Sequence, residues 1–149
     1  MVTSVAIMLY ESQVVDSVCR FLTQNGFRVT QRLATNAHGE DIRALAPDRK
    51  QQVTIEAKGA TSSRAKSNRY GKPFNSGQVR DHVAKAVYSA ARYVSTDTLT
   101  GVAFPQNDAH VKCVDKIMPA LKKLKIEVFW VAAEKTVKIE RHWTIWGGR

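Results

Sequence analysis

The residues best suited to chemistry in this sequence are two carboxylates and one amine: Asp41, Glu56 and Lys58. Glu56 and Lys58 belong to the segment Ile55-Glu56-Ala57-Lys58-Gly59, which ends a stretch of alternating apolar residues. Because residues i and i+2 of a strand face the same side, Glu56 and Lys58 should project together, about 6–7 Å apart at the backbone. A carboxylate there can hold Mg²⁺, and an ammonium group beside it can orient a water or stabilise charge on a phosphoryl group.

A second acid is needed because a single carboxylate makes a poor magnesium site. Asp41 begins the preceding predicted strand, and the turn Pro47-Asp48-Arg49-Lys50 leads into the strand that bears Glu56. Antiparallel pairing across this turn should bring Asp41 back to the end of the hairpin that holds Glu56. The backbone carbonyl of Ala57 would be a further oxygen ligand. The sequence therefore predicts a site for Mg²⁺, with Mn²⁺ as a substitute, at this end of the hairpin.

The acid-x-Lys triplet by itself is a weak signal, since a chain of this length should hold about one by chance. A second triplet, Asp48-Arg49-Lys50, lies in the turn. Its residues are typical of a solvent-facing turn, and no acid stands at the start of a strand before it. We therefore place the site at Glu56-Ala57-Lys58.

The elements that must position these residues follow from hydrophobic periodicity. They predict an α/β fold with a mixed central sheet flanked by helices, in one domain over residues 1–149. The β-α-β unit over 99–131 should be parallel with a right-handed crossover. Helices are expected over about 5–25, 76–95 and 109–123, and strands over about 27–34, 41–46, 51–58, 99–104, 126–132 and 136–145.

Asp41 followed by Glu56-Ala57-Lys58, within an α-β-β-β-α-β order over roughly residues 5–104, resembles the PD-(D/E)XK or restriction-endonuclease-like nuclease superfamily. The resemblance implies a Mg²⁺-dependent phosphodiesterase with that core and a C-terminal α-β-β extension. It also implies that Asp41 and Glu56 are metal ligands and that Lys58 is the catalytic lysine. The sequence departs from the pattern in one respect, because no proline precedes Asp41.

Two further residues resemble positions in this superfamily. Archaeal-type Holliday junction resolvases and Mrr-like restriction enzymes add an acid on the first helix, and Glu11 matches it as a further metal ligand. Many members carry a Gln or Lys on the helix after the motif strand, which here would be Gln78. Each residue has a structural alternative. Glu11 suits the first turn of a helix that starts near Met8, and Gln78 would form a capping box with Asn75.

The two central acids also have a structural alternative. Asp41 and Glu56 could lie on a half-exposed strand face and form surface ion pairs with Arg43 and Lys58. Such pairs are common and contribute little to stability. This alternative leaves the spacing of both acids a coincidence.

The charge of the chain favours a polyanionic partner. Lys and Arg number 23 against 13 Asp and Glu, a net charge of +10, and phosphate neutralisation releases counterions. The segment over 59–75 has no periodicity and no acid. We expect it to grip the DNA backbone, with aromatic stacking. Its expected contacts are Arg64, Lys66, Arg69, Tyr70 and Lys72.

The remaining features of the sequence concern the expected location of the protein and the state of its cysteines. No apolar run approaches the roughly 20 residues of a membrane span, and no basic leader precedes the apolar N-terminus, so we expect a cytoplasmic protein without membrane contact. Cys19 and Cys113 lack metal spacing and should be free thiols. The resulting hypothesis is a Mg²⁺-dependent DNA endonuclease, acting as a homodimer because so small a domain contacts one strand. The alternatives are an inactive DNA-binding module of the same fold and an RNA-binding or interaction protein without a metal site.

Overall fold

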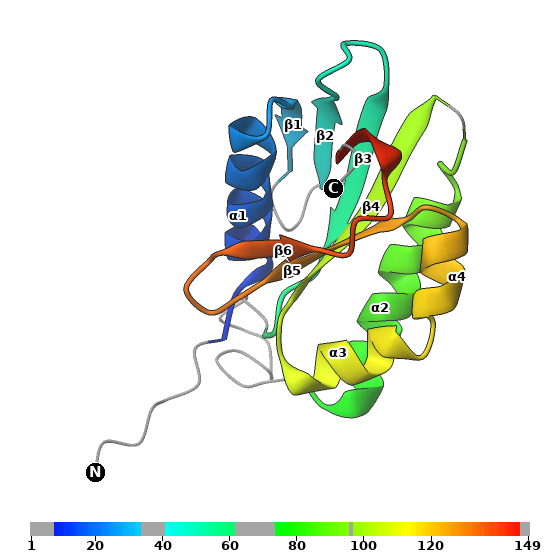
Figure 1. The fold of residues 1–149 in the computed structure, drawn as a ribbon. Helices are drawn as coiled ribbons and strands as arrows, with labels where there is room; N and C mark the ends of the chain where they lie inside the picture. Colours follow the sequence, from blue (N-terminus) through cyan, green and yellow to red (C-terminus); the bar gives the residue numbers. More distant parts are fainter. Residues whose placement is uncertain (1–7, 34–40, 62–73, 96, 147–149) are drawn as a thin grey trace.

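The structure is a computed structural model that describes residues 8–33, 41–61, 74–95 and 97–146 (Figure 1). Its elements follow the predicted order of one helix, three strands, a helix and a strand, and then a C-terminal extension. In chain order they are α1 (Glu11–Gln24), β1 (Arg28–Arg32), β2 (Ile42–Leu45), β3 (Gln52–Ala57), α2 (Ser76–Ala91), β4 (Thr98–Pro105), α3 (Asp108–Asp115), α4 (Met118–Lys123), β5 (Glu127–Val131), β6 (Val137–Ile139) and a 3-10 turn (Thr144–Trp146).

The six strands form one mixed sheet in the order β1-β2-β3-β4-β5-β6. β1, β2 and β3 pair antiparallel, β3, β4 and β5 pair parallel, and β6 returns antiparallel to β5. The predicted mixed α/β sheet is confirmed, and so is the parallel pairing of the two strands in the β-α-β unit. The hairpin between β2 and β3 is antiparallel with Ile42 opposite Ile55, as the turn chemistry predicted.

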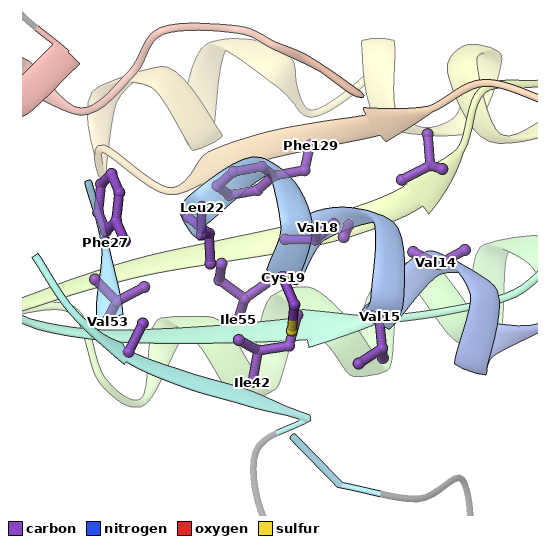
Figure 2. Packing of buried hydrophobic residues seen from close by; sticks show 14 of the residues in the cluster. Val14, Val15, Val18, Cys19, Leu22, Phe27, Ile42, Val53, Ile55 and Phe129 are labelled. Atoms are coloured by element: carbon purple, nitrogen blue, oxygen red, sulfur yellow. The ribbon is translucent and has the colours of Figure 1, made fainter. Parts of the chain in front are cut away.

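One face of the sheet is covered by α1, whose apolar stripe packs on it. Figure 2 shows Val14, Val18 and Leu22 of this helix among side chains from the sheet. Alternate residues of the hairpin, including Ile42 and Ile55, point to this face and are fully buried. The side that faces α1 therefore holds the odd-numbered residues of β3.

The opposite face of the sheet is covered by α2, α3 and α4 (Figure 1). Val79, Val83, Ala86 and Ala90 form the buried stripe of α2, whereas Val94, which the apolar periodicity also suggested, lies beyond the helix and is exposed. The other strand residues, such as Val102 of β4, point into this second cluster. Even-numbered residues of β3 therefore belong to the face that α2 covers.

Three predicted elements have different bounds in the structure. The helix expected over 109–123 is two helices, because Pro119 lacks the N–H that a continuous helix needs, and it stands instead in the first turn of α4. The first helix starts at Glu11, and residues 8–10 are not helical. The second helix ends at Ala91, short of the predicted residue 95. These corrections leave the order of elements unchanged.

The last predicted strand, over 136–145, is also wrong in length. β6 ends at Ile139, and Arg141 has a positive φ of 65° that turns the chain away from the sheet. The carboxylate of Glu127, fully buried on β5, accepts hydrogen bonds from the His142 and Trp143 backbone N–H groups. The hydrogen bonds of this buried side chain at the start of β5 thus direct the chain back over the sheet rather than along it.

This C-terminal segment completes the core beside α1. Trp143 and Trp146 stack with ring centroids 5.4 Å apart, and both contact Phe27 and Phe129. The indole N–H of Trp146 donates to Glu127, and that of Trp143 donates to a backbone carbonyl. Trp143 is a core residue, and Trp146 is partly buried against the core.

Two findings bear on the cellular context. Within the described ranges, no helix combines the length and the apolar character that crossing a bilayer requires. Cys19 is buried in α1 and Cys113 is half-buried in α3, and both are free thiols as predicted.

Candidate active site

The candidate site lies where β3 ends and the chain passes beneath the start of α1. The Lys58 backbone N–H bonds to the Ala103 carbonyl at 3.0 Å, which extends the ladder with β4 by one residue. The Ala60 N–H then donates to the Leu9 carbonyl at 2.8 Å. The residues after the motif strand are thereby fixed to the segment that leads into α1.

Gly59 is the residue that permits this close approach. A Cβ atom at this position would lie 2.5 Å from the backbone nitrogen of Glu11 and 2.9 Å from the carbonyl carbon of Tyr10. No side chain fits in that space, so only glycine lets the backbone of α1 rest on the end of the motif. Gly59 therefore has a packing role that brings Glu11 to Lys58.

Asp41 holds the other side of β3. Among the described residues, the last backbone pair of the hairpin joins Ile42 and Ile55, so β3 extends past the start of β2 and no described residue of β2 pairs with Ala57. The Asp41 carboxylate takes this place and accepts the N–H at 2.7 Å from Oδ2. The prediction that the hairpin returns Asp41 to the end bearing Glu56 is confirmed.

Glu56 lies on the sheet face that α2 covers. Its register partner in β4 is Val102, which packs in the cluster under α2, and its side chain is half-buried. Continuing the hairpin register by one residue from Ile42 and Ile55 sets Asp41 opposite Glu56. Residues opposite each other in an antiparallel pair are close neighbours. The two predicted metal-binding acids therefore meet at the same end of the hairpin.

Glu11 is the first residue of α1. It therefore lies in the first turn of the helix, where an acid is also favoured for purely structural reasons. It also interacts electrostatically with Asp41 and Lys58. The pKa of Glu11 is raised to about 7, chiefly by partial burial and then by the negative charge of Asp41, while the positive charge of Lys58 acts in the opposite direction. The resemblance placed Glu11 beside Asp41, and the electrostatic coupling between the two carboxylates agrees with that placement.

The pKa of Asp41 is also raised above its ordinary value. The cause is again loss of solvent around the carboxylate, which the hydrogen bond from Ala57 and the charge of Lys58 partly offset. Two desolvated carboxylates and one ammonium group leave excess negative charge when both acids are ionised. A divalent cation would relieve this excess.

His82 of α2 is a neighbour of the site that the sequence analysis missed. Burial lowers its pKa, and the next largest contribution is the positive charge of Lys58. The ring of Phe74 meets it edge-on, with centroids 4.4 Å apart. His82 directly precedes Val83 of the buried stripe. Nothing in that position distinguishes it in the sequence from a surface histidine.

Gln78 forms the capping box that its structural alternative describes. Its Oε1 accepts the Asn75 backbone N–H at 2.9 Å, and its own N–H donates to the Asn75 side chain at 2.9 Å. This box starts α2 directly after Phe74, whose N–H donates to the Ala60 carbonyl. A catalytic role of Gln78 remains a prediction from the resemblance.

The predicted DNA contacts of the segment after the motif lie outside the described residues. They are Arg64, Lys66, Arg69, Tyr70 and Lys72.

The donors near the end of β3 suit a hard cation. Carboxylate oxygens of Asp41, Glu56 and Glu11, with the carbonyl of Ala57, are the ligand type that Mg²⁺ prefers. Within the described part of the chain, no three or more His, Cys, Asp or Glu residues form a group that could hold a metal ion. The donor chemistry fits Mg²⁺, while the full ligand set remains a prediction.

Comparisons with known proteins found no sequence match and only distant structural similarity. No protein-family model and no curated protein matches the sequence. An XisH family protein from Nostoc punctiforme PCC 73102 is similar in structure, with a TM-score of 0.44 and 11% identity. An fdxN element excision controlling factor protein from Anabaena variabilis has a TM-score of 0.46 and 16% identity. Each match covers 85% of this chain and 96% of the other chain. Identities and TM-scores this low assign neither a family nor an activity to this chain.

Proposed function

We propose that this protein is a metal-dependent endonuclease that hydrolyses phosphodiester bonds in DNA. The observation that supports this most directly is the position of Asp41, whose carboxylate bonds to Ala57 between Glu56 and Lys58. Glu11 reaches the same place from α1, as its electrostatic coupling to Asp41 and Lys58 indicates. In this proposal, three acids and one amine from separate parts of the chain act together at one end of the sheet.

Each residue has a distinct role in this proposal. Asp41 and Glu56, with Glu11 and the Ala57 carbonyl, would hold Mg²⁺. When bound, the ion would neutralise phosphate charge and lower the pKa of a bound water. Lys58 supplies a positive charge that orients the attacking water or stabilises the negative charge that develops on the phosphoryl oxygens.

The rest of the molecule supports a polyanionic substrate. The net charge of +10 draws DNA by counterion release, and the α/β scaffold holds the acids on strand ends and a helix start rather than on free loops. We further propose that two copies act together, because one domain of 149 residues is small enough to contact only one of the two strands of a duplex. A cytoplasmic location would accord with this substrate.

The test is cleavage of supercoiled and linear duplex DNA in Mg²⁺ or Mn²⁺, with EDTA as the blank. Wild-type protein should nick or linearise the plasmid, while Glu56→Gln and Lys58→Met should lose at least a hundredfold in rate. Asp97→Asn is the matched control and should cut like wild type, because this exposed acid precedes β4 at the end of the parallel β3–β4 pair opposite the site. Equal cutting by wild type and Glu56→Gln would show that the activity comes from a contaminant.

A second candidate is a catalytically inactive nucleic-acid-binding domain of the same fold. It is favoured by the lack of a group of three metal-binding side chains among the described residues, and by the use of one Asp41 oxygen for Ala57. Calorimetric titration with Mn²⁺ separates the two. Binding that is lost in Asp41→Asn supports the nuclease, whereas no binding together with tight DNA or RNA affinity supports the inactive domain.

A further inference from the structure

A groove of about 680 Å³ lies between α2 and α3. It is lined on the α2 side by Gly77, Arg80 and Ala84, and on the α3 side by Ala109 and Lys112 among others. Residues three or four apart share one face of a helix, so each helix presents a continuous stripe to the groove. Small residues on both stripes keep the helices from filling the space between them.

The groove is strongly positive. Arg80, Lys112 and Lys116 line it, and no acidic residue does. All three side chains are exposed, and within the described residues none of them takes part in an ion pair. Asp81, Asp108 and Asp115 belong to the same helices but are not among the residues that line the groove. Three free cations around an apolar floor favour an anionic ligand with spaced charges.

The position of the groove connects it to the candidate active site. Its edge includes Ser76 and Gly77 at the start of α2. The residue before the helix cap, Phe74, bonds to Ala60, which follows Lys58 by two residues. A ligand that leaves the end of β3 along α2 therefore reaches the groove within the first turn of this helix. Figure 1 shows α3 beside the start of α2 at this end of the molecule.

From this arrangement we infer that the α2–α3 groove binds the sugar–phosphate backbone of the DNA that flanks the scissile bond. The inference rests on the proposed function for its substrate. Lys112 and Lys116 stand one helical turn apart, about 6 Å between Cβ atoms, and so can contact neighbouring phosphates. Arg80 faces them from α2 as a fork-shaped donor. The apolar floor, which includes Val83 and Ile117, contacts the sugars.

The first test is DNA affinity in EDTA, where cleavage plays no part. The groove variant combines Arg80→Ala, Lys112→Ala and Lys116→Ala. Its affinity for a 30-base-pair duplex should fall at least tenfold, and the slope of log affinity against log salt should drop by about 2 to 3.

A matched control removes the same charge elsewhere. It combines Arg28→Ala, Lys50→Ala and Lys138→Ala, exposed residues of β1, the β2–β3 turn and β6. Because only the net charge changes in this variant, its affinity should stay within about threefold of wild type. An equal loss in both variants would overturn the groove as a specific contact.

Cys113 gives a readout at the groove itself. This half-buried thiol lines the groove, whereas Cys19 is fully buried in α1. Saturating DNA should slow the alkylation of Cys113 at least fivefold in wild-type protein, with Cys19 as the unreactive internal reference. Unchanged alkylation in the presence of bound DNA would overturn the inference.

These outcomes separate the groove from the proposed enzyme activity. If wild-type protein binds DNA through the groove but does not cut it, the nuclease proposal is rejected and DNA binding by the groove stands. If the groove variant cuts DNA as fast as wild type and binds it with the same affinity, the nuclease proposal stands and DNA binding by the groove is rejected.

Discussion

The carboxylate of Asp41 accepts the backbone N–H of Ala57, with 2.7 Å between the nitrogen and Oδ2. This bond joins the start of β2 to the end of β3, where the strand pairing between them has stopped. One side chain thus completes the sheet edge and brings a charge to the predicted metal site. Its structural and chemical contributions can be separated by substitution.

Asp41→Asn should keep the fold and lose the chemistry. The amide oxygen still accepts the Ala57 N–H, so the free energy of unfolding should change by less than about 1 kcal/mol. Asp41→Ala leaves that N–H without its partner and should cost about 1–3 kcal/mol. Both variants should lose divalent-metal binding and DNA cleavage. Urea unfolding and Mn²⁺ calorimetry measure the two effects, and metal binding by Asp41→Asn equal to wild type would remove Asp41 as a ligand.

Glu11 should make the metal-free protein less stable as the pH rises. Its pKa of about 7 in the folded state exceeds the ordinary glutamate value of 4.5. Between these pH values the folded state holds a proton that the unfolded state has lost, so stability falls from about pH 4.5 to 7. Allowing for solvent screening at a partly exposed group, the slope is roughly half of 1.4 kcal/mol per pH unit. Glu11→Gln should remove it, as measured by urea unfolding in EDTA.

Added Mg²⁺ is the control for this effect. A bound cation favours the ionised carboxylates, so wild-type protein in Mg²⁺ should gain stability above pH 7 and Glu11→Gln should gain less. The same gain in both proteins would place the cation away from Glu11.

His110 should act in the opposite direction. Its pKa is lowered to about 4, chiefly by burial and to a smaller extent by the neighbouring His82. As the pH falls from 6.5 to 4 the unfolded state takes up a proton that the folded state refuses, so stability declines by up to about 1.4 kcal/mol per unit. His110→Gln should abolish this decline. Because the Glu11 and His110 effects oppose each other, Glu11→Gln should show a steeper acid-side loss than wild type.

Gly59→Ala should damage both stability and activity. The new Cβ would lie 2.5 Å from the backbone nitrogen of Glu11, so the start of α1 must move. Such overpacking costs about 1–3 kcal/mol. The shift also displaces Glu11 from Lys58, so cleavage should fall more than stability predicts. Gly77→Ala, where the nearest atom is the Asn75 side chain at 3.4 Å, is the stability control and should leave the free energy of unfolding nearly unchanged.

Glu127 should be essential for the C-terminal segment and irrelevant to the site chemistry. Its carboxylate accepts backbone or indole N–H groups from Val128, His142, Trp143 and Trp146. Glu127→Gln turns an amide N–H₂ toward some of these donors and should cost about 1–3 kcal/mol, with a change in tryptophan fluorescence. Glu140→Gln, which alters a bond to Trp130 at an exposed position, should cost less than about 1 kcal/mol. Similar losses in both variants would contradict the special role of Glu127.

The sequence by itself determined the order of the elements and the place of the site in the chain. Period-2 and helical apolar patterns reflect which face is buried, so they located the β2–β3 hairpin and the stripe of α2. The turn at Pro47-Asp48-Arg49-Lys50 fixed the hairpin, and with it the return of Asp41 to the end that bears Glu56. These features depend on neighbouring residues, which a sequence displays directly.

The tertiary structure decided what depends on contacts between distant segments. The short β6 follows from the buried Glu127, whose partners His142, Trp143 and Trp146 lie 15 or more residues away. The raised pKa of Glu11 and the meeting of His82 with Lys58 follow from desolvation and from charges on other elements. Burial and electrostatic interactions between distant residues arise only when the chain folds. The sequence therefore identified the candidate acids, but only the tertiary structure showed that the start of α1, with Glu11, packs against Gly59.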